Sequence, residues 1–172
     1  MLTGLTPWKK YRSVNRGIRW IVLGMAVTVS LMLPASYPIT TAAAVDAQEL
    51  RCLALTLYWE ARAEKRDAME AVAWVVLNRR KNPEFPKTIC AVVREGGEKP
   101  PCQFSYWCDG KAETPQNDEA WKRTRKIATD MLENPSRDPT GGVLFFHSSD
   151  IAPPWTKERK RTARIGRDIF YR

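Results

Sequence analysis

The sequence contains only one histidine, His147, and its four cysteines do not form paired CxxC motifs. Zinc sites in proteins are built from clustered histidine and cysteine ligands, and thiol catalysis needs a cysteine beside a histidine. The composition therefore argues against a metal site and against a Cys/His nucleophile, and we expect no cofactor. The sequence also lacks internal repeats and low-complexity tracts, which argues against a repeat architecture.

The first 44 residues contain no acidic residue. Basic residues between Lys9 and Arg19 precede an apolar run over residues 20–33, and small residues follow up to Ala44 and Ala47. This order is typical of a secretory signal peptide that is cleaved after Ala44 or Ala47. The apolar run is shorter than the roughly 20 residues of a membrane-spanning helix. An uncleaved N-terminal membrane anchor through this run is the alternative.

Both interpretations predict an exported protein of the periplasm or cell envelope. They divide the chain into a leader, residues 1–44, and one small domain, residues 45–172. Five of the 28 basic residues belong to the leader, which leaves 23 against 19 acidic residues, a net charge of +4. Much of this excess lies in residues 157–167. Because an exported protein rarely meets nucleic acid, we expect no nucleic-acid partner and instead a solvated basic face near an anionic polymer or membrane surface.

Export also determines how the cysteines are interpreted, because an oxidising compartment favours two disulfides over free thiols. Three pairings are possible among the four residues, which are Cys52, Cys90, Cys102 and Cys108. We favour Cys90–Cys102, which closes a short loop. The remaining pair, Cys52–Cys108, would then connect the first helix to a later segment.

A carboxylate interrupts an apolar helical pattern near residue 60. Apolar residues recur at helical spacing along one face, namely Leu50, Leu53, Ala54, Leu57, Tyr58 and Ala61. Glu60 falls at the edge of this face beside Trp59, where partial desolvation should raise its pKa. A raised pKa allows a carboxyl group to act as a general acid near neutral pH. Glu64 is expected one turn later on the same side of the helix. The alternative to a catalytic Glu60 is an amphipathic helix whose rim carries charged residues without a catalytic role.

Helix-capping residues, helix-ending Asn-Pro pairs and β-prone runs along the chain predict further helices and one small sheet. Asp67 and Glu70 are spaced as a capping box that opens a second, strongly apolar helix, which we expect to be central and to end at Asn82-Pro83. A short third helix is predicted up to Arg94, and another helix from Thr114-Pro115 to Asn134-Pro135. Residues 143–148 and 165–171 are β-prone and predicted to pair as an antiparallel ribbon. The expected fold class is mainly α (α+β).

Five sequence blocks resemble the SleB-type cell wall hydrolases, a family that includes spore cortex-lytic enzymes. The blocks occur in the family's order from about Arg51 to Tyr171, and they are Tyr58-x-Glu60-Ala-Arg-Ala-Glu64, Ala71-Val-Ala-x-Val-Val-Leu-Asn78-Arg79, Phe85-Pro-x-Thr-Ile-Cys-x-Val-Val93, Cys102-Gln-Phe-Ser105 and Ile165-Gly-x-x-Ile-Phe-Tyr171. The resemblance implies a lysozyme-like helical domain with a small antiparallel β element. It also implies cleavage of the β-1,4 bond between N-acetylmuramic acid and N-acetylglucosamine in peptidoglycan strands, with Glu60 as the catalytic acid.

The resemblance and the aromatic content together supply candidate substrate-binding residues. These are Glu64, Gln103, Phe104, Ser105, Tyr106, Trp155 and Tyr171. Aromatic rings offer flat apolar surfaces to sugars, although core packing is the alternative for each of them. Glu64 could equally pair with Arg62 or orient the site.

A single carboxylate favours a lytic transglycosylase, in which Glu60 acts first as acid and then as base towards the muramic acid 6-hydroxyl. A hydrolase would need a second carboxylate. Glu64, expected on the same helix, could hardly reach the opposite face of the sugar, and Asp109 is the other candidate. A non-catalytic peptidoglycan-binding module is a further alternative. Amidase action on the peptide stem is disfavoured because it would need a zinc site or a Cys/His pair. The sequence does not determine the oligomeric state.

Two positions depart from the family pattern. Family members often carry glycine where Ala63 stands, and frequently histidine where Asp168 stands. The second difference argues against a paired-histidine role and leaves His147 as a structural or groove-lining residue.

Overall fold

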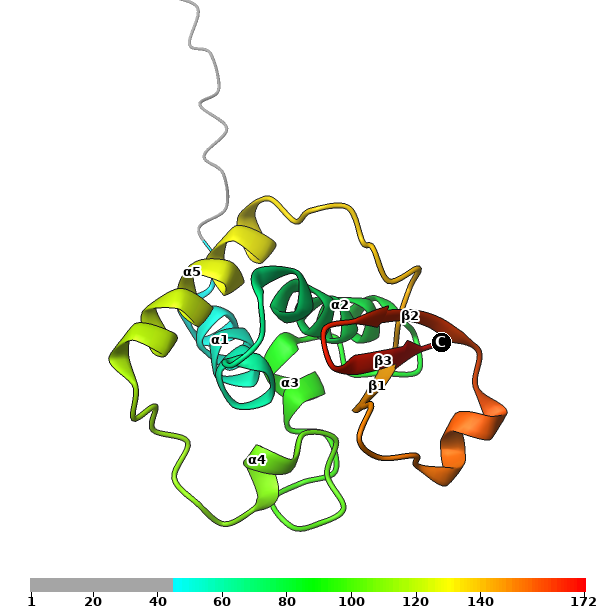
Figure 1. Cartoon of the computed structure of the whole chain (residues 1–172). Coiled ribbons are helices and arrows are strands. Elements are labelled where there is room, and N and C mark those ends of the chain that lie inside the picture. Colours follow the sequence, from blue (N-terminus) through cyan, green and yellow to red (C-terminus); the bar gives the residue numbers. More distant parts are fainter. Residues whose placement is uncertain (1–44) are drawn as a thin grey trace, which may run out of the picture. The chain divides into compact units, whose positions relative to one another are not determined.

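The computed structural model describes residues 45–172 (Figure 1). The predicted signal peptide or membrane anchor, residues 1–44, lies outside the described residues. None of the helices between residues 45 and 172 combines the length and apolar character needed to cross a membrane. In chain order the elements are α1 Ala47–Ala61, α2 Arg66–Lys81, α3 Ile89–Val93, α4 Ser105–Cys108, α5 Asp118–Glu133, β1 Phe145–Ser148, the 3-10 helix η1 Pro154–Glu158, β2 Arg161–Ile165 and β3 Asp168–Tyr171. The predicted fold class, mainly helical with a small antiparallel sheet, is confirmed.

Helices α1 and α2 form the centre of the domain. The Asp46 side chain caps α1 by accepting hydrogen bonds from the backbone N–H groups of Gln48 and Glu49, at 2.7 and 3.0 Å. Every residue from 52 to 58 in α1 and from 71 to 77 in α2 is buried, because α1 packs against α2, α3 and α5. The prediction of a centrally buried second helix is therefore confirmed.

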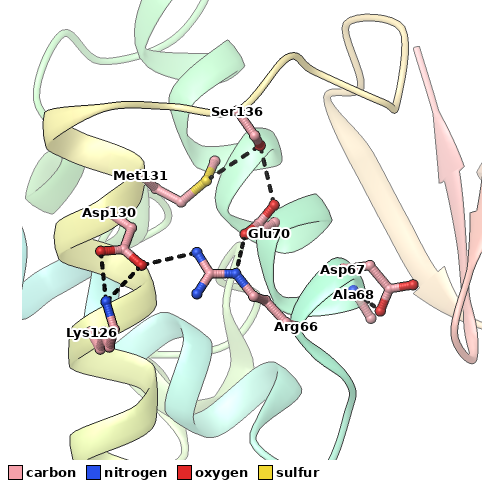
Figure 2. A network of polar contacts seen from close by, with 8 residues as sticks. All are labelled: Arg66, Asp67, Ala68, Glu70, Lys126, Asp130, Met131 and Ser136. Atoms are coloured by element: carbon pink, nitrogen blue, oxygen red, sulfur yellow. Dashed lines mark hydrogen bonds and ion pairs between the residues drawn. The ribbon is translucent and has the colours of Figure 1, made fainter.

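The capping box predicted at Asp67 is wrong. An N-cap at Asp67 would start the helix at Ala68, but α2 begins two residues earlier, at Arg66, and its N-cap Lys65 makes no side-chain capping bond. Glu70 is instead engaged by Arg66, whose Nε donates to Glu70 Oε1 at 2.6 Å and whose Nη2 donates to Asp130 Oδ2 at 2.9 Å (Figure 2). The carboxylate that would have closed the box thus takes part in a network that links α2 to α5.

The favoured disulfide pairing is also wrong. Cys52 bonds to Cys90, and Cys102 bonds to Cys108. Because α1 packs on α3, Cys52 and Cys90 lie side by side with their Cα atoms 5.3 Å apart. The second bridge spans the short α4 segment. The prediction that the four cysteines form two disulfides is confirmed, but both predicted pairs are wrong.

The strands form one antiparallel sheet in the order β1-β3-β2. The predicted pairing of the two β-prone segments is confirmed, with Phe146 opposite Phe170 and Ser148 opposite Asp168. Strand β2 was not predicted, because its segment was interpreted only as a basic face. It is an edge strand, and its exposed Arg161 and Arg164 supply part of that face.

The turn between β2 and β3 packs closely against the turn between α1 and α2. Gly166, in this turn, has a φ of +58°, and a Cβ added to it would lie 2.7 Å from Glu64 Oε2 and 3.1 Å from Ala68 Cβ. A side chain at this position would be strained by the left-handed backbone and would displace the Glu64 carboxylate. The sheet is thereby held beside the C-terminal end of α1.

Candidate active site

Glu60 lies in the last turn of α1, at the wall of a cavity of about 250 Å³. The residues that line this cavity are Trp59, Glu60, Ser105, Tyr106, Asp109, Lys111, Ala112 and Glu113. They come from α1, from α4 and from the segment that follows α4. The cavity therefore combines the predicted catalytic carboxyl group with the aromatic segment between the two later cysteines.

The environment of Glu60 favours its protonated form. Burial, and to a smaller extent the negative charge of Asp168, raise the pKa of Glu60 from the ordinary 4.5 to about 7. The raised pKa expected from the edge position on α1 is thus confirmed. The side chain is partly exposed, so a ligand in the cavity can reach a carboxyl group that still holds its proton near neutral pH.

Tyr106 forms the wall beside Glu60 and is fixed by a buried hydrogen bond. The Thr56 hydroxyl donates to the Cys52 carbonyl at 3.0 Å, so the Tyr106 hydroxyl donates to Thr56 Oγ1, also at 3.0 Å. The Trp59 and Tyr106 rings are stacked, with their centroids 6.4 Å apart. Burial raises the pKa of Tyr106, so its hydroxyl remains a neutral donor. Two flat aromatic surfaces therefore flank the acid.

The segment on the other side of the cavity is tied to α1 through Tyr58. The buried Tyr58 hydroxyl accepts hydrogen bonds from the backbone N–H groups of Gln116 and Asn117, both at 3.0 Å. The Cys102–Cys108 bridge closes the loop from which Ser105 and Tyr106 project. Two covalent or buried polar connections thus hold the cavity walls in place.

Two of the predicted substrate-binding residues, Ser105 and Tyr106, line the cavity with Glu60. Gln103 is exposed and does not line it, and Phe104 is buried in the core beneath the Arg79 guanidinium. Glu64 lies beyond the end of α1 rather than on the same helix, and its Oε1 accepts a hydrogen bond from Arg167 Nε at 2.9 Å. Its partner is therefore Arg167 and not Arg62.

Trp155 and Tyr171 belong to a separate aromatic cluster around His147. His147 Nδ1 lies 2.8 Å from the Ser148 carbonyl oxygen, to which only an N–H can donate, so Nε2 accepts from the Tyr171 hydroxyl at 3.1 Å. The Trp155 ring packs edge-on against both His147 and Tyr171, with centroids 5.6 and 5.4 Å apart. None of the three lines the cavity beside Glu60.

Several residues near Glu60 were not identified from the sequence. Lys111, Ala112 and Glu113 line the cavity but lie in an irregular segment, and no periodicity distinguishes them. Asp168 is buried on β3 and acts on Glu60 through its charge. Strand alternation could have found it, because Asp168 shares a face with the apolar Phe170.

A second cavity, of about 430 Å³, is larger than the one beside Glu60. It is lined by Arg62, Asn117, Glu119, Ala120 and Arg123, and its only carboxylate is exposed. We assign the chemistry to the smaller cavity because it contains the carboxyl group with the raised pKa. Among residues 45–172 no group of three or more histidine, cysteine, aspartate or glutamate side chains is placed to hold a metal ion.

Comparison with known proteins gives three consistent findings. A family model described as Cell Wall Hydrolase matches residues 63–171, beginning just after Glu60. A spore cortex-lytic enzyme of Bacillus subtilis (strain 168) is 32% identical over 123 residues, which is 71% of this chain and 37% of that protein. A spore cortex-lytic enzyme of Halalkalibacterium halodurans is also 32% identical, over 34% of its length. The chain thus spans little more than a third of these curated relatives.

Two solved structures to which this chain is similar are catalytic domains. The catalytic domain of the germination-specific lytic transglycosylase SleB from Bacillus anthracis superposes with a TM-score of 0.61 and is 28% identical, over 77% of this chain and all of that one. The catalytic domain of the Bacillus cereus SleB protein gives a TM-score of 0.58 at 27% identity, over 80% of this chain and 99% of that one. The predicted lysozyme-like helical fold is shared with these domains.

Proposed function

Since this chain belongs to the Cell Wall Hydrolase family, we propose that it is an enzyme that cleaves the glycan strands of peptidoglycan. The bond cleaved is the β-1,4 link between N-acetylmuramic acid and N-acetylglucosamine, and the reaction is a lytic transglycosylation. The similarity to a catalytic domain described as a lytic transglycosylase supports this choice of reaction. The observation that carries the proposal is the partly buried carboxyl group of Glu60, with a pKa of about 7, at the wall of a cavity.

The chemistry follows from that one group. Glu60 donates its proton to the glycosidic oxygen as the bond breaks and an oxocarbenium-like centre develops on the muramic acid. The resulting Glu60 carboxylate then accepts the proton of the muramic acid 6-hydroxyl, whose oxygen attacks the anomeric carbon. The product is a 1,6-anhydro sugar, Glu60 regains its proton, and no water is consumed. Trp59 and Tyr106 would pack against the sugar rings.

A muramidase-type hydrolase is the second candidate, because the same cavity contains other carboxylates. Asp109 and Glu113 both line it. Asp109 is exposed, and one of its carboxylate oxygens lies 3.5 Å from Lys111 Nζ. A hydrolase would use such a carboxylate to activate water or to form a covalent intermediate.

Analysis of the digestion products distinguishes the two reactions. Purified peptidoglycan is incubated with the protein, and the released fragments are examined by mass spectrometry. We expect fragments ending in 1,6-anhydro-muramic acid, which are 18 Da lighter than the hydrolytic products because no water is added (~18 Da is the mass of one water). Fragments with only reducing ends would replace the transglycosylase proposal with hydrolysis. Binding to peptidoglycan without any release would support a non-catalytic module instead.

The rate of cleavage should fall as the pH rises through the pKa of Glu60. The acid form is the active one in the first step, and its fraction declines about tenfold per pH unit above that pKa. We therefore expect kcat/KM on a soluble glycan to be maintained below pH 7 and to fall above it, with a midpoint of about 7. A fall centred on the ordinary value of 4.5 would mean that Glu60 is not held in its protonated form.

We further propose that the protein acts in the cell envelope after export. Both disulfides lie within the described domain, and disulfides persist in oxidising compartments such as the periplasm. Residues 1–44 would serve as the signal peptide or membrane anchor. Protease accessibility of the domain in intact cells, with the outer membrane permeabilised, would test this placement.

A further inference from the structure

Asp168 points from the sheet towards the helices. It is the first residue of β3, and residues two apart on a strand project from the same face. Phe170 is fully buried in the core formed mainly by α1 and α2, whereas Ile169 and Tyr171 share the opposite face with His147. Asp168 therefore lies on the face that packs against the helices, and only 7% of its surface is exposed.

The turn before β3 brings Asp168 close to the end of α1. Gly166 approaches Glu64 and Ala68 closely, and Arg167 Nε donates to Glu64 Oε1 at 2.9 Å. Both contacts fix the β2–β3 turn beside the residues that follow Glu60 in the chain. Asp168 thus lies next to the C-terminal end of the helix that carries the acid.

The Asp168 carboxylate is not neutralised by a bonded partner. Within residues 45–172 it takes part in none of the side-chain hydrogen bonds or ion pairs, although Ser148 is its partner in the strand register. A carboxylate that is largely buried and has no bonded cation acts more strongly on neighbouring groups than an exposed, paired one.

We propose that Asp168 is a positioning residue whose negative charge keeps the proton on Glu60 until a glycosidic oxygen takes it. The inference rests on the proposed role of Glu60 as the acid, and it assigns to Asp168 an electrostatic action on Glu60 rather than contact with the sugar. A negative charge near a carboxyl group disfavours loss of its proton, and it does so more strongly where water is excluded.

The charged groups around Asp168 and Glu60 determine which of the two loses its proton first as the pH rises. Burial, and after it the negative charge of Glu64, raise the pKa of Asp168 to about 6, while Arg167 and His147 limit the rise. The Glu60 pKa is about 7, and its other neighbours across the cavity are Tyr106, Asp109, Lys111 and Glu113. As the pH rises, Asp168 therefore releases its proton before Glu60 does. Asp168 carries its charge in the range where Glu60 must hold a proton.

The test compares Asp168→Asn, which removes the charge at nearly constant shape, with Asp168→Glu, which keeps it. Asp150→Asn is the matched control, because Asp150 is an exposed aspartate of the same domain. The carboxyl carbon of Glu60 is titrated by NMR in the full-length protein without substrate, and kcat/KM is measured from pH 5 to 9. The NMR titration does not depend on activity, so it remains informative if the proposed function fails.

We expect Asp168→Asn to move both the Glu60 midpoint and the fall in kcat/KM to lower pH. A shift of half a pKa unit corresponds to about a threefold loss of rate at pH 8, with a change of less than about twofold at pH 5.5. Asp168→Glu and Asp150→Asn should retain the wild-type midpoint. A midpoint unchanged in Asp168→Asn, or moved equally in Asp150→Asn, would overturn the proposal, as would an equal rate loss at every pH.

The wild-type protein provides a second test that needs no folded variant. Because the two carboxyl groups interact, the Glu60 resonance should show a smaller second inflection at the midpoint of Asp168, about 6. A single-step titration of Glu60, together with an independent Asp168 midpoint, would show that the two groups do not interact.

Discussion

Glu60→Gln should lose cleavage of peptidoglycan by about a thousandfold, the middle of the range of roughly 10²–10⁴ for removal of a general acid. Glutamine has nearly the same shape and can occupy the same place at the end of α1, but it has no proton to give to the glycosidic oxygen. Turnover is measured from fragments released from purified peptidoglycan, and Glu84→Gln, an exposed glutamate after α2, is the matched control. Retention of activity in Glu60→Gln would remove this residue from the mechanism.

The same substitution should make the protein more stable above neutral pH. The pKa of Glu60 is raised in the folded state, so between about pH 4.5 and 7 the unfolded chain releases this proton while the folded protein keeps it. The free energy of unfolding therefore falls over this range. Glutamine has no such penalty, and we expect a gain of about 1–3 kcal/mol in the free energy of unfolding at pH 8, allowing for partial exposure. No difference is expected below pH 4.5. Equal stability at pH 8 would indicate that Glu60 is not desolvated.

Removal of the Cys52–Cys90 bridge should produce the larger of the two disulfide effects on stability. This bridge closes a separation of 38 residues, and the Cys102–Cys108 bridge closes only 6. The loop-entropy relation gives about 4 kcal/mol for the first and about 2 kcal/mol for the second. Replacing each pair by alanine and measuring denaturant unfolding tests this order.

For activity we expect the opposite order, with the larger effect from the Cys102–Cys108 bridge. Cys102–Cys108 holds the segment from which Ser105 and Tyr106 reach the cavity, whereas Cys52–Cys90 joins α1 to α3 away from it. Under conditions in which both double variants are folded, loss of the shorter bridge should lower kcat/KM more. In the denaturant-unfolding measurement, a larger loss of stability on removal of the Cys102–Cys108 bridge would contradict the loop-entropy explanation.

The helical part of the fold was predictable because its signals are local. Asn-Pro pairs follow α2 and α5, and the apolar spacing of α1 and α2 shows in any window of the sequence. Strand β2 was missed because an edge strand with exposed arginines has no apolar alternation, and its stability comes from pairing with β3. The disulfide partners depend on which helices pack together, and the spacing of cysteines along the chain does not carry that information.

The candidate active site, like the fold, was predictable where its signals are local in the sequence. The edge position of Glu60 on an apolar helix indicates a desolvated carboxyl group, and the aromatic segment between two cysteines indicates the wall that contains Tyr106. Trp155 and Tyr171 were grouped with the site from composition and resemblance, yet they pack around His147. The influence of Asp168 on Glu60 arises only when the sheet folds against the end of α1.

The most direct test of this account is the titration of the Glu60 carboxyl group itself in the wild-type protein, followed by NMR of its labelled carbon. The account predicts a midpoint of about 7, so that a proton is still available at the pH of the cell envelope. A midpoint at the ordinary value of 4.5 would mean that Glu60 is already ionised there, and the proposed acid step would be contradicted.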